Sequence, residues 1–325
     1  YTPNQQENIA RNKTLVNGAR YYVDHAHPEY SCPEVTNPRD VVIHEKAGER
    51  IVEISRREAT SLLPADRQML IYKNSSDRKG NSYGCHENYL MDRRVSFKQI
   101  VEHLTPVFVT RQVFTGAGKV GSESRGHRCD YQVSQRADFF ETEVALDTMV
   151  KRPIINTRDE PHADPLRYRR LHVIVGDANL CEVATFLKVG TTAIILAMVE
   201  DDVLDPTLAL ADPVRALQAV SWDLSLSKPL NLMDGRSATA LGIQWGLLES
   251  AGKYLAQRGT EGVGGAVADD VGARWEQGLA SLERDPTGLV GQVDWIAKRH
   301  LVEGFRDRHD LAADDLRLAA LDRQY

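Results

Sequence analysis

The sequence predicts a mixed α+β fold in which short strands are interleaved with helices. Residues 41–57 carry apolar side chains at helical spacing with charged residues between them, which indicates an amphipathic helix. Short apolar runs at 131–134 and 171–175 are typical of buried strands. At 325 residues, of which 42% are hydrophobic and 26% charged, the chain is long enough to bury a substantial core.

The remaining elements follow from the same patterns and from the positions of Gly and Pro. In chain order we expect a strand within 17–30, the helix 41–57, a strand 69–72, a loop 73–81, a second strand within 83–90, a helix 96–115 interrupted near Pro106, a mobile loop 116–130, the strands 131–134 and 171–175, a long apolar helix 182–199, and helices from Pro213 on with a loop at 259–265.

Charge and cysteine content exclude several classes of protein. A net charge of −6 argues against a general nucleic-acid-binding protein and gives no reason to expect a membrane surface. The helix 182–199 is too short, and too charged at its ends, to span a bilayer. The four cysteines are widely spaced without a C-x-x-C motif, so we expect reduced cytosolic thiols and a cytoplasmic protein. These are Cys32, Cys85, Cys129 and Cys181.

The segment 17–30 is unusually rich in polar and titratable side chains. As a strand, its period of two places Arg20, Tyr22 and Asp24 on one face. Because proline cannot continue a central ladder, we expect the strand to end at Pro28 and Glu29 to leave the alternation. Such a face is either solvated or part of a site, and the pattern alone leaves the two interpretations equally open. A zinc site is not indicated, because no further ligand stands at a diagnostic spacing.

Three other segments carry clusters of polar residues, at 85–89, 153–164 and 169–179. The simpler interpretation of each is structural: His172 on an apolar strand as a core histidine, and the acidic residues of 153–164 as a solvated loop with capping roles. The sequence contains no Walker A loop, GxGxxG, HExxH or GxSxG motif, which removes the commonest nucleotide-binding, metalloprotease and serine hydrolase interpretations.

Four motifs resemble the Dop and Pup-ligase family of actinobacteria. They are YVDHAHPEY at 22–30, NSYGCHENYL at 81–90, INTRDEPHAD at 155–164 and RRLHVIVGDAN at 169–179. The similarity runs through essentially the whole chain. The form Asp-His-Ala-His-Pro-Glu-Tyr at 24–30 is similar to the branch that deamidates Pup and removes it from proteins, whereas the ligase branch has a differently spaced segment there.

The resemblance implies a glutamine synthetase-like fold, in which a curved, mostly antiparallel sheet forms a cradle with helices on its convex face. It implies ATP and Mg²⁺ as cofactors, Pup and pupylated proteins as partners, and a monomer. By resemblance, Asp24 is the catalytic carboxylate, Tyr22 and Glu29 belong to the magnesium sites, and Arg20 contacts the nucleotide. His172 resembles a strand histidine near metal and phosphate. Arg136 and Arg158 are candidates for contacts with phosphate or with a Pup carboxylate, because a guanidinium binds such groups in a bidentate manner.

The family pattern also includes an N-terminal Glu-x-Glu pair, an insertion and a small C-terminal domain. We expect residues 1–325 to form the large catalytic domain without these parts. Because the sequence does not begin with Met, we expect that they were cut away, left out or supplied separately. Three functions therefore compete: a deamidase and depupylase, a Pup–protein ligase, and a Pup-binding fragment without catalysis. In the first, Asp24 would act as a nucleophile or as a base on water, and the sequence does not choose between these.

Overall fold

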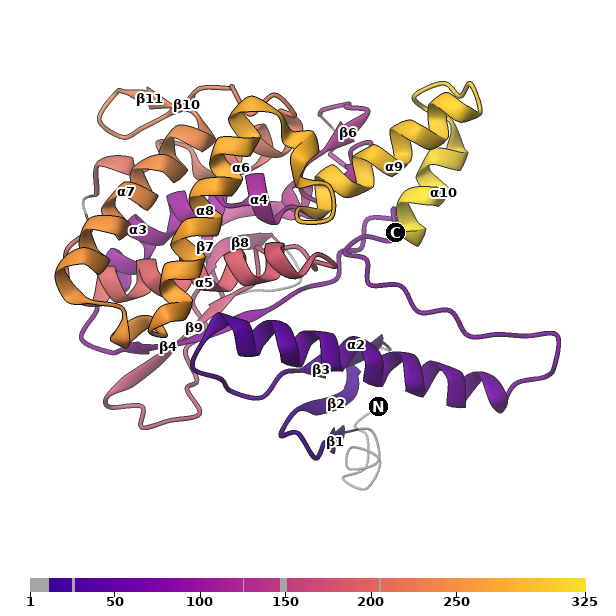
Figure 1. The fold of residues 1–325 in the computed structure, drawn as a ribbon, viewed down its shortest axis with the longest axis horizontal. Helices are drawn as coiled ribbons and strands as arrows, with labels where there is room; N and C mark the ends of the chain where they lie inside the picture. The colour runs from indigo at the N-terminus through magenta and orange to yellow at the C-terminus, as the bar shows by residue number, and fades with distance from the viewer. Residues whose placement is uncertain (1–11, 25–26, 125, 147–150, 205) are drawn as a thin grey trace. The chain divides into compact units, whose positions relative to one another are not determined.

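The computed structural model describes residues 12–24, 27–124, 126–146, 151–204 and 206–325. The chain divides into two compact units, residues 1–72 and residues 73–325, which we describe separately (Figure 1). The prediction that residues 1–325 form a single catalytic domain stays a prediction.

The first unit contains a small antiparallel sheet. Its strands β1 (Asn12–Thr14), β2 (Arg20–Asp24) and β3 (His27–Ser31) lie in the order β1-β2-β3. The prediction that the strand ends at Pro28 is wrong, since β2 ends at Asp24 and Pro28 lies inside β3, opposite Val23. Pro28 is tolerated there because β3 is an edge strand of this sheet, where a missing backbone donor costs no ladder hydrogen bond.

The helix α2 (Pro38–Ser61) packs against β3 and extends the predicted helix at both ends. Asn37 caps it by accepting from the N–H of Asp40 at 3.0 Å, and Pro38 occupies the first turn, where no N–H is needed. The ring of Tyr30 lies against Gly48, where a Cβ would overlap the ring carbons. Glycine at this position therefore allows β3 and α2 to approach closely.

The predicted strand 69–72 is wrong. The segment after α2 has no strand assignment, because the backbone of Met69 bonds to side chains of α2 instead of to a partner strand. Its N–H donates to Oγ1 of Thr60 at 3.2 Å, and its carbonyl accepts from Arg56 at 3.1 Å.

The described residues of the second unit form four two-stranded sheets, three of them antiparallel. The antiparallel pairs are β4 (Glu87–Asp92) with β9 (Tyr168–Val173), β5 (Lys119–Val120) with β6 (Tyr131–Gln132), and β10 (Leu230–Asn231) with β11 (Ser237–Ala238). The strands β7 (Phe140–Ala145) and β8 (Arg152–Asn156) pair in parallel, and β8 contacts β9. The strands predicted within 83–90, at 131–134 and at 171–175 are thus confirmed, with shifted bounds.

The helices of this unit are α3 (Phe97–Thr110), α4 (Gln112–Thr115), α5 (Glu182–Glu200), α6 (Pro213–Trp222), α7 (Ala240–Arg258), α8 (Ala266–Arg284), α9 (Asp294–Arg308) and α10 (Leu316–Gln324). Short 3₁₀ turns lie at Ala137–Phe139, Pro206–Leu208, Glu261–Val263 and Pro286–Leu289. Helix α5 forms the centre of the core, since it contacts α3, α7, α8 and β4 (Figure 1). The prediction that this helix is too short and too charged to span a bilayer is wrong: among the described residues it is the one helix long and apolar enough to do so, and 72% of that apolar window is buried inside the protein.

Two predictions for this unit need correction. Helix α3 runs through Pro106 and is separated from α4 only at Arg111. Residues 103–110 are all buried, so packing offsets the hydrogen bond that the proline removes. Within the predicted loop 116–130, Lys119 and Val120 form a strand, because both are buried and pair with β6. The predicted loops at 73–81 and 259–265 carry no helix or strand apart from one turn of 3₁₀ helix.

Candidate functional site

One face of the β2–β3 pair carries the predicted catalytic residue. The register pairs Arg20 with Ser31, Tyr22 with Glu29 and Asp24 with His27, so these six side chains share one face. The shared face of Arg20, Tyr22 and Asp24 is thus confirmed. Glu29 does not leave the alternation as predicted, because β3 begins at His27 and brings Glu29 back opposite Tyr22.

The opposite face of the same strands is covered in part: Tyr30 packs against α2, whereas Val23 is 53% exposed. Tyr30 points to Gly48 of α2, and its hydroxyl accepts from Nδ2 of Asn17 at 3.1 Å. By contrast, Arg20 and Asp24 are exposed, and Tyr22 and Glu29 are half-buried. Helix packing therefore uses the part of one face that carries Tyr30, and Arg20 and Asp24 on the polar face stay exposed.

Tyr22 and Glu29 are directly bonded on this face. The Tyr22 hydroxyl donates to Oε1 of Glu29 and lies 3.2 Å from Oγ of Ser31. Partial burial, reinforced by the bond to Glu29, raises the pKa of Tyr22 to about 12. The guanidinium of Arg20 stacks over the Tyr22 ring, with Cζ of Arg20 5.4 Å from the ring centre. The Tyr22 phenol is therefore neutral at neutral pH.

The donor set of this face suits magnesium. Mg²⁺ takes oxygen ligands and is usually held by one or two carboxylates together with substrate phosphates. Asp24, Tyr22 and Glu29 supply such oxygens, and no soft sulfur lies among them. Across the described residues there is no group of three or more His, Cys, Asp or Glu side chains placed to hold a metal by themselves.

In the second unit, His172 lies on β9 and is buried, with 4% of its surface exposed. Its ring meets that of His86 edge to face, with 5.0 Å between the ring centres. Its Nδ1 has no hydrogen-bond partner among the described residues. Burial, followed by the charges of His86, Arg170 and Arg158, lowers the pKa of His172 to about 4. His172 is therefore a neutral imidazole with a free ring nitrogen in a positively charged setting.

Arg158 stands in the segment that follows β8 and is exposed. Its N–H donates to Oδ1 of Asn156 at 2.9 Å. The next residue, Asp159, is held in a bidentate ion pair by Arg93, at 2.9 and 3.1 Å, and accepts from the backbone N–H of Arg170 at 3.2 Å. The backbone on both sides of Arg158 is thus fixed while its guanidinium faces solvent.

Arg136 is buried, and its donors are directed to neighbouring backbone and hydroxyl groups. It donates to the carbonyls of Ile174 and Gly176, the latter at 2.8 Å, and through Nε to Oγ of Ser82 at 3.0 Å. Burial lowers the pKa of Arg136 to about 10. Arg136 therefore links Ser82 to the segment 174–176 of the same unit. A contact of Arg136 with phosphate or carboxylate stays a prediction.

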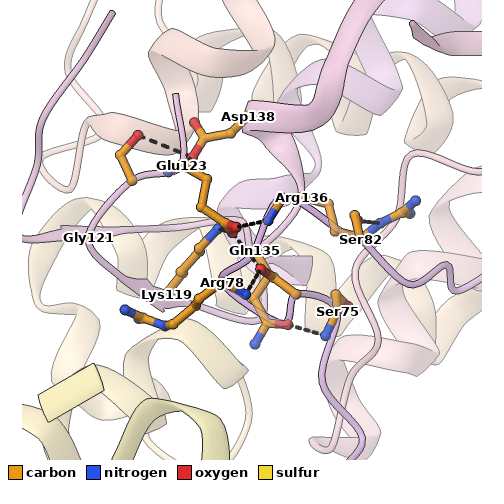
Figure 2. Close-up of polar contacts among 12 residues, drawn as sticks. Ser75, Arg78, Ser82, Lys119, Gly121, Glu123, Gln135, Arg136 and Asp138 are labelled. Carbon is orange, nitrogen blue, oxygen red and sulfur yellow. Dashed lines mark hydrogen bonds and ion pairs between the residues drawn. The ribbon is translucent and has the colours of Figure 1, made fainter. Parts of the chain in front are cut away.

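Figure 2 shows that the loop 75–82, which lies beside Arg136, is held by hydrogen bonds at both of its ends. The N–H of Ser75 donates to Oε1 of Gln135 at 2.8 Å, and Ser82 accepts from Arg136 at the other end. Glu123 lies against the loop, bound by Lys119, and its own N–H donates to Asp138 at 2.8 Å. These contacts hold the loop without using any of the predicted site residues except Arg136.

The structure therefore gathers the predicted residues into two groups. Asp24, Tyr22, Glu29 and Arg20 share one face of the first unit, and His172 lies within electrostatic range of Arg158 in the second. Sequence reasoning missed His27, His86 and Arg170 as members of these groups. The available signal was their position within the same unusual motifs, at 22–30, 81–90 and 169–179.

Comparisons with curated proteins identify relatives over nearly the whole chain. A depupylase of Acidothermus cellulolyticus is 55% identical over 318 residues, which is 97% of this chain and 62% of the relative. A Pup deamidase/depupylase of Mycolicibacterium smegmatis is 49% identical over 316 residues, with the same shares covered. A Pup–protein ligase of Acidimicrobium ferrooxidans is 44% identical over 321 residues, which is 97% of this chain and 69% of the relative. The chain spans about three fifths of the length of the depupylases it matches.

Solved structures give the same result. The Pup ligase PafA in complex with ADP matches with a TM-score of 0.87 and 39% identity, over 97% of this chain and 70% of that one. The complex between Pup and its ligase PafA matches with a TM-score of 0.89 and 38% identity, over 98% and 65%. The predicted glutamine synthetase-like α+β fold is confirmed by these matches. The family model described as Pup-ligase protein covers residues 2–325, and the chain belongs to that family.

Proposed function

We propose that this chain is the catalytic part of a deamidase and depupylase. It would hydrolyse the side-chain amide of the C-terminal Gln of Pup and the isopeptide bond between Pup and a substrate lysine. Both reactions attack the same kind of carbonyl carbon, so one site can serve both. Sequence identity supports hydrolysis over ligation, because the depupylases named above are 49–55% identical to this chain and the ligase is 44% identical.

The observation that carries the proposal is the position of Asp24. Its carboxylate is exposed on the same face as the bonded pair Tyr22 and Glu29, while Tyr30 on the opposite face packs against α2. A carboxylate in this position can attack the amide carbonyl as a nucleophile or take a proton from an attacking water. Both routes remain part of the proposal.

The remaining residues would bind the cofactor and the substrate. Tyr22 and Glu29 would hold Mg²⁺, and Arg20 would contact ATP beside them. When bound, magnesium with the nucleotide phosphates supplies positive charge that stabilises an oxyanion developing on the substrate carbonyl. Arg136, Arg158 and His172 would contact phosphate or a carboxylate of Pup.

The charges of the second unit support the binding of an anion. Near His172, the cations Arg158 and Arg170 are accompanied by the carboxylate of Glu160, which pairs with Arg170 at 2.9 Å. Arg158 has no ion pair of its own among the described contacts and is exposed. A planar guanidinium of this kind suits phosphate and carboxylate groups.

We propose that the protein acts as a monomer in the cytoplasm, on Pup and on pupylated proteins.

A mass-spectrometric assay tests the function. The full-length protein is incubated with Pup ending in Gln, ATP and Mg²⁺, and the expected result is the mass gain that accompanies conversion of Gln to Glu. Asp24→Asn should abolish this conversion and leave ATP binding intact. Asp66→Asn, an exposed carboxylate of the same unit, is the matched control and should retain it. Full activity of Asp24→Asn would rule out the assignment.

The same assay distinguishes the ligase. With Pup ending in Glu and a lysine-bearing acceptor, a ligase forms the isopeptide bond and releases ADP and phosphate in step with product. Isopeptide formation without deamidation would replace the proposal by the ligase. Tight binding of Pup without either reaction would indicate a binding fragment.

A further inference from the structure

The side chain of Arg93, directly after β4, holds both ends of the connection between β8 and β9. Its Nη1 and Nη2 donate to the two carboxylate oxygens of Asp159, near the start of the connection, at 2.9 and 3.1 Å. Its Nε and Nη2 donate to the carbonyl of Tyr168, the first residue of β9, at 3.0 and 2.8 Å. Because a guanidinium is planar and rigid, Arg93 fixes the position of Asp159 relative to β9.

Stability alone gives a weak reason for these contacts. The side chains of Arg93 and Asp159 are 32% and 37% exposed, and an ion pair this open to solvent contributes little to the free energy of folding. The contacts have a geometric effect as well. Oδ1 of Asp159 also accepts from the backbone N–H of Arg170 at 3.2 Å, so the carboxylate joins the connection to β9 two residues before His172.

Arg158 lies between two residues that are held in this way. On one side stands Asp159, and on the other the backbone N–H of Arg158 donates to Oδ1 of Asn156 at 2.9 Å. Asn156 is 2% exposed, and its Nδ2 donates to the carbonyl of Leu146 at 3.1 Å. The guanidinium of Arg158 is exposed, makes no ion pair within the described part of the chain, and lies in electrostatic range of His172. The backbone is therefore fixed around a cation that no carboxylate binds directly.

We propose that Arg93 is a positioning residue, which through Asp159 holds the Arg158 guanidinium beside His172 to bind an anionic oxygen group of the nucleotide or of Pup. The inference rests on the proposed function. Because Arg93 acts through Arg158, its loss weakens binding of that anion and leaves the bond-breaking step unchanged. Its loss has no further effect once the Arg158 guanidinium is absent, which distinguishes positioning from a general contribution to stability.

A double-mutant cycle tests this role. The full-length protein is compared with Arg93→Gln, Arg158→Gln and the double variant. Calorimetry measures Kd for ATP with Mg²⁺ and, separately, for Pup. We expect each single variant to raise Kd by about tenfold for one of these two probes and by less than about twofold for the other. A rise for ATP identifies the anion as a phosphate, and a rise for Pup identifies it as a carboxylate. The double variant should bind no more weakly than Arg158→Gln.

Deamidation at saturating ATP and Pup provides the second readout, and Arg93→Gln should keep kcat within about twofold of the parent value. Arg299→Gln breaks an ion pair of similar exposure on α9, is the matched control, and should change neither Kd nor kcat. Asp159→Asn removes the charge that Arg93 binds and keeps an acceptor for the N–H of Arg170. It should give the same pattern as Arg93→Gln, and unchanged thermal midpoints exclude misfolding.

Two outcomes would overturn the proposal. Unchanged Kd values for both probes in Arg93→Gln and Asp159→Asn would mean that the contacts do not position Arg158. Losses that add in the double variant would mean that Arg93 acts independently of Arg158. Failure of the proposed function looks different, because the parent protein would then neither deamidate Pup nor release it from a substrate, while the Kd values of the variants could still be compared.

Discussion

The hydroxyl of Tyr22 donates a hydrogen bond to the carboxylate of Glu29 across the paired strands β2 and β3. The two residues are directly opposite in the register, seven positions apart in the chain, and both are half-buried. Each therefore restricts the other, and Glu29 is oriented on the polar face before any ion binds. A carboxylate oriented in this way binds a metal with less loss of side-chain freedom.

The hydrogen bond between Tyr22 and Glu29 predicts that removing the Tyr22 hydroxyl weakens magnesium binding. Tyr22→Phe should raise the Mg²⁺ concentration needed for half-maximal deamidation by about tenfold, because it removes a hydroxyl that is itself a proposed ligand and that also orients Glu29. Tyr21→Phe removes a hydroxyl from the opposite face of the same strand and is the control. The measurement is a magnesium titration at saturating ATP. Equal magnesium requirements in the two variants would contradict the proposed role.

The sequence predicted the polar face of β2 but not the hairpin that contains it. Alternation alone places Arg20, Tyr22 and Asp24 together, because that depends only on the period of a strand. Whether Pro28 ends a strand depends on whether that strand lies at an edge, and this is decided by pairing partners that the local pattern does not contain. His27 was missed for the same reason, since only the register places it opposite Asp24.

The second unit shows the same limit. Strands and the helix α5 follow from apolar patterns, whereas the pairing of Glu87 with Arg111 joins β4 to the junction of α3 and α4. Twenty-four positions separate the two residues, and each looks like an ordinary surface charge in the sequence. Long-range partners of this kind depend on how elements pack, and a local pattern carries no information about that.

The buried pair predicts a large effect on stability. Arg111 binds Glu87 through two nitrogens, and the two side chains are 2% and 6% exposed. Glu87→Gln should lower the free energy of unfolding by about 3 kcal/mol, because it leaves a buried guanidinium without its counter-charge. The exposed pair of Glu249 and Lys253 is the control, and Glu249→Gln should leave the free energy of unfolding nearly unchanged. Urea unfolding measures both, and equal losses would contradict the prediction.

A glycine beside this pair provides a second test of packing. At Gly176 a Cβ would lie 2.8 Å from Oε1 of Glu87, and that carboxylate cannot move without giving up Arg111. Gly176→Ala should therefore lower the free energy of unfolding by about 1–3 kcal/mol. Gly252→Ala on α7, where no atom lies within 4 Å, should be neutral or stabilising by up to about 1 kcal/mol. Thermal or urea unfolding compares the two variants. An unchanged free energy of unfolding in Gly176→Ala would show that a methyl group fits between Gly176 and Glu87.

The neutral state of His172 predicts a dependence of stability on pH. Its pKa is about 4 in the folded protein and 6.5 for an ordinary histidine, because burial and the charges of His86, Arg170 and Arg158 disfavour the imidazolium. Between these two values the unfolded chain binds a proton that the folded protein does not. The free energy of unfolding should therefore fall as pH decreases from 6.5 to 4, and this contribution should be constant above pH 6.5.

His172→Gln removes the titrating group and should reduce that fall by roughly 1–2 kcal/mol, less than the full shift would give because Arg158 is exposed and solvent screens its charge. The measurement is urea unfolding of both proteins at pH 7.5 and at steps down to pH 4.5, and the difference at pH 7.5 serves as the reference. As pH decreases, the free energy of unfolding of the variant should fall less than that of the parent protein. A constant gap would mean that His172 takes up a proton in the folded state as readily as in the unfolded chain, through a counter-charge close to its ring.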